Sequence, residues 1–175
     1  MKIINIIITI LILGCTNTSQ KDIFDIARRG NISELKNILN TNHNLINKEN
    51  NSGYTPLILA SYYENNKIVS YLIKNGATID KISNLGTALM AASYKSNNKS
   101  AKLLIDNNAN VNLSDSKGTT ALHYACFNQN LELVKLLISK KANPLIKDLK
   151  GKTPLDYSIE NNNIEIIKIL NLKTN

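Results

Sequence analysis

The sequence predicts an all-α protein, a solenoid of about five helix–turn–helix repeats joined by short hairpin-like fingers. One phrase occurs four times in the 175 residues, as GYTPLILAS, LGTALMAAS, GTTALHYAC and GKTPLDYS. The threonines in these phrases, Thr55, Thr87, Thr120 and Thr153, are 32, 33 and 33 residues apart. Self-similarity at a fixed period of roughly 20 to 50 residues is typical of repeat architectures. Leucines and isoleucines at helical spacing follow each phrase, so each repeat has an apolar stripe that only a neighbouring repeat can cover.

Residues 1–14, MKIINIIITILILG, precede the repeats and predict a signal peptide. Lys2 is followed by an apolar run over residues 3–13, which only Asn5 and Thr9 interrupt. About eleven residues are too few to cross a bilayer, which takes about 20 residues in a helix. We therefore expect the chain to be exported.

The segment ILGC, residues 12–15, resembles the lipobox of bacterial lipoproteins, although Leu13 stands where a smaller residue is more usual. The resemblance implies cleavage before Cys15 and a diacylglycerol on its thiol, with residues 15–20 as a short tether. We expect a membrane-anchored lipoprotein on the periplasmic or the surface face. The alternative is an uncleaved or conventionally cleaved signal with an accidental cysteine.

The remaining chain, residues 21–175, resembles the ankyrin-repeat family. The second unit shows the family's parts in order: a glycine turn, a Thr-Pro-Leu helix start, an apolar second helix and a Gly-Ala turn, at Gly53, Thr55, Pro56, Leu57, Ala60, Ile68, Val69, Leu72, Ile73, Gly76 and Ala77. Threonine before a helix caps its free amides, and proline at the first position sacrifices no hydrogen bond. The predicted repeats are 21–50, 51–82, 83–115, 116–148 and 149–175, with the outer two as caps.

Some positions depart from the family pattern. Ala88 and Ala121 replace proline, and the turn before Thr87 is one residue short. Asn108 and Lys141 stand at the position of Gly76, where a left-handed turn suits asparagine better than lysine. We expect the least regular finger at residues 83–86.

Catalytic and metal-binding constellations are missing from the sequence. His43 and His123 are the only histidines, and His123 occupies the family's histidine position, which implies a structural role. Cys126 has no partner once Cys15 is lipidated, and we expect it in the interior. We predict no enzyme, no metal and no cofactor, and keep a hydrolase as a less favoured alternative.

The resemblance implies that partners bind a groove lined by the fingers and the first helices. One column of equivalent positions contains Tyr62, Tyr94, Phe127 and Glu160, and the next contains Tyr63, Lys95, Asn128 and Asn161. Exposed aromatic rings are frequent interface anchors; alternatively, these rings only cover the joints between first helices. The predicted partner-binding residues are Tyr54, Tyr62, Tyr63, Tyr94, Lys95, Lys117, Phe127, Asn128, Lys150, Lys152 and Glu160.

The formal net charge is +8, and six lysines lie between residues 135 and 152. Such a cluster attracts an acidic protein, anionic lipid headgroups or an anionic polymer, whereas an ordinary lysine-rich surface is the simpler explanation. No nucleic-acid-binding motif is present, so nucleic acid is not an expected partner. We predict a monomeric protein–protein interaction module; the alternative is an adhesin that holds an anionic polymer or lipid headgroups on its lysine-rich fingers.

Overall fold

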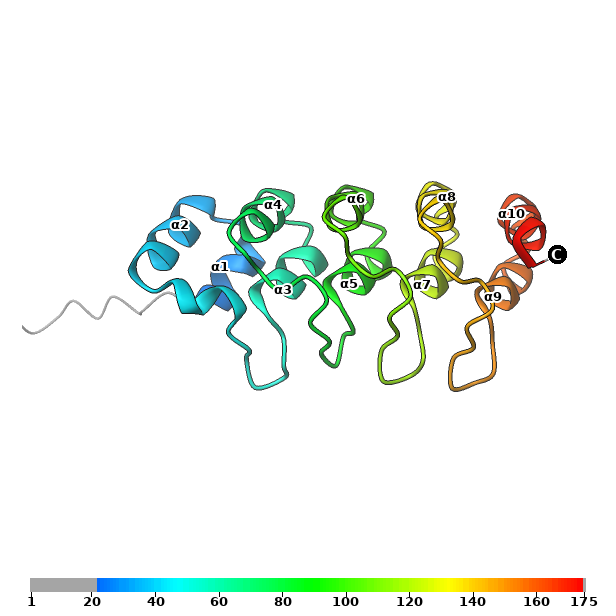
Figure 1. Cartoon of the computed structure of the whole chain (residues 1–175), viewed down its shortest axis with the longest axis horizontal. Coiled ribbons are helices and arrows are strands. Elements are labelled where there is room, and N and C mark those ends of the chain that lie inside the picture. Colours follow the sequence, from blue (N-terminus) through cyan, green and yellow to red (C-terminus); the bar gives the residue numbers. More distant parts are fainter. Residues whose placement is uncertain (1–21, 175) are drawn as a thin grey trace, which may run out of the picture.

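The computed structural model describes residues 22–174, and these form ten α-helices and one short 3-10 helix. The helices follow one another as five pairs stacked along one axis (Figure 1). The elements are α1 (Ile23–Arg29), α2 (Ile32–Thr41), η1 (His43–Asn47), α3 (Pro56–Tyr62), α4 (Asn66–Lys74), α5 (Ala88–Tyr94), α6 (Asn98–Asp106), α7 (Ala121–Phe127), α8 (Leu131–Ser139), α9 (Pro154–Glu160) and α10 (Ile164–Thr174). The predicted all-α repeat solenoid is confirmed.

The stack has two helical layers and a row of loops. The first helices of the pairs, α1, α3, α5, α7 and α9, form the middle layer, and the second helices, α2, α4, α6, α8 and α10, form the layer on one side of it (Figure 1). The loops before α3, α5, α7 and α9 project on the other side as fingers. We number these fingers 2 to 5 after their repeats: finger 2 (49–55), finger 3 (82–87), finger 4 (114–120) and finger 5 (147–153).

Each of the four repeated threonines caps a first helix, as the sequence predicts. The hydroxyl oxygens of Thr55, Thr87, Thr120 and Thr153 each accept a hydrogen bond from the backbone N–H three residues later, at 3.3 to 3.4 Å. Such a cap satisfies an amide that has no partner within the helix and contributes about 1 kcal/mol. The repeat phrase thus fixes where each first helix begins.

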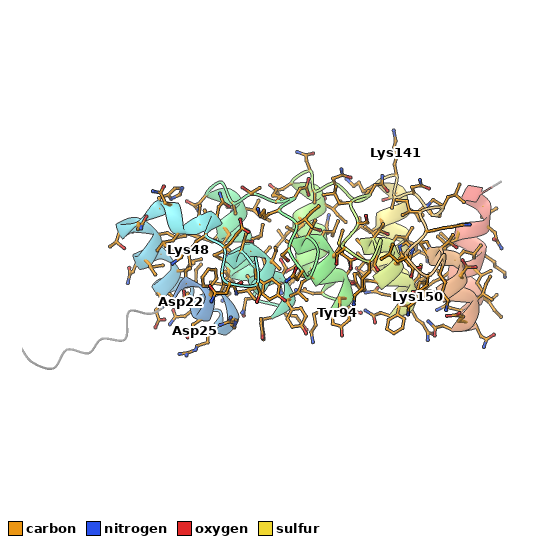
Figure 2. The ribbon with its side chains drawn as sticks, turned by 90° about the horizontal axis from the view of Figure 1, so that it is seen from below. Asp22, Asp25, Lys48, Tyr94, Lys141 and Lys150 are labelled. Atoms are coloured by element: carbon orange, nitrogen blue, oxygen red, sulfur yellow. The ribbon has the colours of Figure 1, made fainter. Side chains whose placement is uncertain are left out.

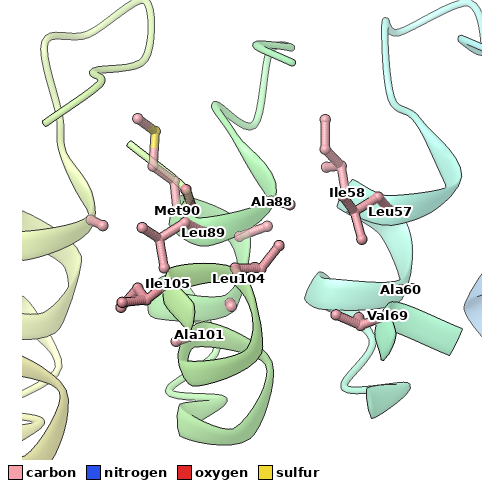
Figure 3. Close-up of a cluster of buried hydrophobic side chains, with 14 of the residues drawn as sticks. Leu57, Ile58, Ala60, Val69, Ala88, Leu89, Met90, Ala101, Leu104 and Ile105 are labelled. Atoms are coloured by element: carbon pink, nitrogen blue, oxygen red, sulfur yellow. The ribbon is translucent and has the colours of Figure 1, made fainter. Parts of the chain in front are cut away.

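The core runs along the whole stack between the two helical layers. Leu72, Leu104 and Leu137 are fully buried and lie in three consecutive repeats, and Leu57, in the same repeat as Leu72, is fully buried too. Figure 3 shows the part of this core between α3, α4, α5 and α6. Cys126 is free and buried, as expected. Because each apolar stripe is covered by the next repeat, the repeats stabilise one another.

The expected departures from regularity are also visible in the backbone. Gly76, Asn108 and Lys141 all adopt left-handed φ angles, of 88, 66 and 64°. Finger 3 closes with a tight turn in which the N–H groups of Ser83 and Gly86 each donate to the other's carbonyl, at 3.1 and 2.9 Å. The one-residue deletion therefore shortens this finger without disturbing the helices beside it (Figure 1).

The predicted signal peptide (1–14), Cys15 and the tether (15–20) lie outside the described residues. Within the described residues, no helix combines the length and the apolar composition that crossing a membrane requires.

Candidate partner-binding groove

Fingers 4 and 5 are built in the same way around an aspartate. One carboxylate oxygen of Asp115 accepts hydrogen bonds from the N–H groups of Lys117 and Thr119, at 2.8 and 2.9 Å. The other accepts one from the hydroxyl of Tyr124 in α7, at 2.8 Å. Asp148 repeats this pattern 33 residues later, with Tyr157 in α9 donating to it at 2.6 Å. Each finger is thereby tied to the first helix of its own repeat.

The two fingers are also joined to each other. The N–H of Leu149 donates to the carbonyl of Lys117 at 2.8 Å. Gly118, at φ +75°, lies so close to finger 5 that a Cβ there would be 3.0 Å from the Cα of Asp148. This position requires glycine both for its backbone angle and for the close approach. Fingers 4 and 5 thus form one wall.

His123 adds a third connection between these repeats. Its Nδ1 lies 3.1 Å from the backbone N–H of Thr120, which can only donate, so Nδ1 is an unprotonated acceptor. Its Nε2 consequently carries the proton and donates to the carbonyl of Lys152 in finger 5, at 3.1 Å. Burial lowers the pKa of His123 and so favours this neutral form. The structural role expected for His123 is confirmed by these contacts.

The wall of fingers and the first helices enclose a hollow of about 420 Å³. It is lined by Tyr94 of α5, by residues of α7 and α9, and by both fingers: Tyr94, Lys117, Thr119, His123, Tyr124, Phe127, Asp148, Leu149, Lys150 and Tyr157. Figure 2, which faces the finger side of the stack, labels Tyr94 and Lys150 in adjacent parts of the molecule. We call this hollow the finger groove.

Aromatic rings continue from the finger groove along the first helices. Tyr62 stacks on Tyr94, with ring centroids 6.1 Å apart and planes 13° apart. Tyr94 meets Tyr124 edge-on at 5.6 Å, and Phe127 meets Tyr157 edge-on at 6.1 Å. Such pairs stabilise the joints between repeats. Tyr94 and Phe127 nevertheless remain 48% and 55% exposed, so these two rings both cover joints and present surface.

Hydrogen bonding fixes the charge states on the floor of the groove. Burial alone would raise the pKa of Asp148, but the bonds donated by Tyr157 and by the backbone of Lys150 and Lys152 lower it below its usual value. The same bond to Asp148 raises the pKa of Tyr157 to about 12. Burial and the bond to Asp115 raise the pKa of Tyr124. At neutral pH the aspartate is therefore charged and both tyrosines are neutral donors.

Four of the eleven predicted partner-binding residues line the finger groove: Tyr94, Lys117, Phe127 and Lys150. Two more lie at its edge, where the ammonium of Lys152 pairs with Glu160 and lies 5.4 Å from the centroid of the Tyr157 ring. The structure thus brings six of the eleven predicted residues to the finger groove or its edge.

The other five predicted residues lie elsewhere. Tyr62, Tyr63 and Lys95 form a group next to Tyr94, where Tyr63 is 48% exposed and the Lys95 ammonium lies 5.3 Å from the Tyr62 ring centroid. Tyr54 is partly buried in finger 2. Asn128 uses its side-chain amide to donate to the carbonyls of Ser93 and Tyr94, at 3.1 and 2.7 Å. Its amide is therefore engaged within the stack.

Sequence reasoning missed several residues of the finger groove, above all Tyr124, Tyr157 and Asp148, and it missed Asp115, which holds Tyr124 in place. The spacing was a usable signal, since a tyrosine follows an aspartate by nine residues in two successive repeats. Leu149, at the tip of finger 5, is 79% exposed and also lines the groove. An exposed leucine of this size at the rim of a hollow adds apolar surface to that of the rings.

The six lysines of residues 135–152 do not form one patch. Lys150 lies at the finger groove, whereas Lys141 projects from another edge of the stack (Figure 2). Lys152 is paired with Glu160. The positive potential of the fingers is therefore smaller than the lysine count suggests.

Comparison with known proteins agrees with the architecture. No curated protein matches the chain. A family model described as "Ankyrin repeats (3 copies)" matches residues 23–115 and again residues 89–174. Together the two matches span nearly all of the described residues. The chain belongs to the ankyrin-repeat family, whose members are generally non-enzymatic modules for protein–protein interaction.

Proposed function

We propose that this chain is an exported, lipid-anchored protein of a bacterial envelope that holds a segment of another protein in the finger groove. One observation carries the binding site: half-exposed rings and an exposed leucine converge on a hollow whose wall is fixed by hydrogen bonds. Tyr94, Phe127 and Leu149 are 48%, 55% and 79% exposed there. Large apolar side chains beside a preformed hollow favour binding because little conformational entropy is lost when a partner enters.

The chemistry of the groove indicates the kind of segment that fits. An apolar or aromatic side chain can enter between Tyr94, Phe127 and Leu149. Lys117 and Lys150 stand on the fingers beside them, so an acidic group next to that side chain gains an opposite charge. Asp148 cannot readily bind a cation, because Tyr157 and two backbone amides already use its carboxylate oxygens.

The site is tested by a crosslinking pull-down from the native envelope, read by mass spectrometry. The full chain is compared with a Tyr94→Ala, Phe127→Ala variant and with a matched control, Ile159→Ala, Ile164→Ala. The control residues are 51% and 65% exposed and lie outside the finger groove. We expect one protein to be enriched by the native chain and by the control but not by the groove variant.

Equal recovery by all three proteins would contradict the finger groove. A different result would favour an adhesin that binds an anionic polymer through its lysines: recovery falls steeply as the salt concentration is raised, and the aromatic substitutions have no effect on it. The proposed anchor is tested separately. A Cys15→Ala variant should lose both acyl labelling and membrane association in cell fractions, and unchanged acyl labelling would contradict Cys15 as the lipidation site.

A further inference from the structure

A second hollow lies on the opposite side of the stack, between the second helices α2, α4 and α6. It encloses about 620 Å³. Ile32, Tyr71 and Leu103 contribute apolar surface to it, and five lysines surround this surface: Lys36, Lys67, Lys74, Lys99 and Lys102. We call it the lysine hollow. Of its lining residues, only Asp106 is acidic.

Few of these charges are neutralised by the protein itself. Lys102 pairs with Asp106 at 2.7 Å, and the ammonium of Lys36 lies 5.8 Å from the centroid of the Tyr71 ring. Lys67, Lys74 and Lys99 are exposed and form no ion pair with any residue in the described part of the chain. Like charges held this close together favour an external anion.

The lysine hollow lies within the first three repeats. Lys67 and Lys99 are both the second residue of their helices, α4 and α6. The equivalent residues of α8 and α10 are Glu132 and Glu165. The same face of the stack is thus strongly positive near the N-terminal end and mixed in charge near the C-terminal end.

We infer that the lysine hollow docks on an anionic membrane surface, with its lysines against lipid phosphates and with Tyr71 and Leu103 facing the interface. This inference rests on the proposed lipid anchor. A chain spans at most about 3.5 Å per residue. The seven residues that follow Cys15, up to Asp22, would therefore hold the first repeat within roughly 25 Å of the bilayer. Clustered lysines beside an anchor are the usual means of contact with anionic lipids.

This orientation leaves the finger groove accessible. The second helices and the fingers lie on opposite sides of the stack (Figure 1). When the second helices of the first repeats face the membrane, the fingers face away from it. A partner protein could then enter the finger groove without competing with the bilayer.

The test uses the full lipidated chain, reconstituted into vesicles of phosphatidylcholine alone or mixed with phosphatidylglycerol. A lysine-reactive acylating reagent is applied, and labelling is quantified at each lysine by mass spectrometry. We expect Lys67 and Lys99 to be labelled several-fold less in the anionic vesicles, and this protection to disappear at high salt. Lys135 and Lys168, on the second helices beyond the hollow, and Lys117, on finger 4, should be labelled equally in both.

Charge reversal provides the matched comparison. Lys67→Glu, Lys99→Glu should abolish the protection of Lys36 and Lys102 in anionic vesicles. Lys135→Glu, Lys168→Glu makes the same change of charge on the same layer of helices and should leave it intact.

Equal labelling of Lys67 and Lys99 in the two vesicle types would overturn the inference. The same labelling is repeated in native membranes. Protection of Lys67 and Lys99 there, without protection in the anionic vesicles, would also overturn the inference and assign the hollow to an acidic protein. A chain that carries no acyl group on Cys15 in cells would contradict the anchor itself, whereas an acylated chain with unprotected lysines contradicts only the lysine hollow.

Discussion

Fingers 3 and 4 are one repeat apart, yet they differ in length and in how they are held. Finger 4 has an aspartate, Asp115, that accepts a hydrogen bond from Tyr124 of α7. Finger 3 has Ser83 in place of the aspartate, and α5 has Ala91 in place of the tyrosine. Finger 3 therefore lacks this connection to its helix. It is also one residue shorter. Three local changes, namely one missing residue, Ser83 and Ala91, thus distinguish finger 3 from finger 4, which lines the finger groove.

The shorter finger also changes the surface around it. An open hollow of about 630 Å³ extends over the tips of fingers 2, 3 and 4, and its lining is largely serine and asparagine. The finger groove, between fingers 4 and 5, has aromatic rings instead. Within one repeating fold, apolar contact surface is thus concentrated in the repeats whose fingers are tied to their helices.

The largest expected effect is on the buried core, which the repeats of fingers 3 and 4 have in common. Leu104, in α6, belongs to the same repeat as finger 3, and Leu137, in α8, belongs to the same repeat as finger 4. Both leucines are fully buried. Leu104→Ala and Leu137→Ala should each lower the free energy of unfolding by about 2 to 5 kcal/mol, because each leaves a cavity. The measurement is denaturant unfolding followed by circular dichroism. A loss below about 1 kcal/mol at either site would show that this part of the core is loosely packed.

Removing a tyrosine hydroxyl deletes the bond to aspartate by which fingers 4 and 5 differ from finger 3. Tyr124→Phe or Tyr157→Phe should each cost about 1 kcal/mol, since each deletes a hydrogen bond to a charged aspartate at a partly exposed site. Tyr54→Phe, in finger 2, is the control, because among the described residues Tyr54 forms hydrogen bonds only through its backbone, with Asn50. Unfolding measurements in which all three variants match the native chain would show that the fingers are not held by these bonds.

The same bonds predict how stability depends on acid. The pKa of Asp148 is lowered in the folded chain from an ordinary value of 3.8, so its contribution is present above about pH 4. It is lost as the pH falls through the lowered value. The difference between the native chain and Tyr157→Phe should therefore shrink below pH 4, and a difference that grows there would contradict the assignment.

His123 gives a smaller effect in a higher range of pH. Its pKa is lowered from 6.5, so the unfolded chain binds a proton more readily than the folded one. Stability should fall as the pH is reduced below about 6.5, because protonation of Nδ1 opposes the N–H of Thr120. A His123→Gln variant should show a flatter profile between pH 7 and pH 5. Equal slopes in the two unfolding series would exclude this mechanism.

The smallest expected effect is a gain. The hydroxyl of Ser61 is buried and has no hydrogen-bond partner among residues 22–174, whereas that of the equivalent Ser93 donates to the Leu89 carbonyl at 2.8 Å. Ser61→Ala should raise the free energy of unfolding by up to about 1 kcal/mol, and Ser93→Ala should not. A destabilised Ser61→Ala protein would indicate that the hydroxyl has a partner in solution.

Much of the fold is predictable because it depends on contacts that are local or periodic. The helix caps at Thr55 and its equivalents, the burial of Leu104 and Leu137, and the left-handed turn at Asn108 all follow from position within the repeat. The resemblance to the ankyrin-repeat family also placed Tyr94 and Phe127 at exposed positions of the first helices, and both rings are about half exposed.

The remaining features depend on how fingers and helices meet, which a repeat pattern does not specify. Asp148 and Tyr157 come together because finger 5 folds back on α9, so a separation of nine residues becomes a hydrogen bond. The Asn128 amide is drawn away from the surface because the last carbonyls of α5 have no partner within their helix. Local hydrogen-bonding demand therefore decides which exposed positions stay available to a partner.

The central claim is that a partner protein occupies the finger groove, and site-specific photocrosslinking tests it most directly. A photoreactive residue is placed at Leu149, which lines the groove, and separately at Leu145, which is 59% exposed but does not line it. We expect Leu149 to crosslink one envelope protein, the yield to fall when Tyr94 and Phe127 are alanine, and Leu145 to give no such product. The same product from both positions, or from Leu145 alone, would contradict the account.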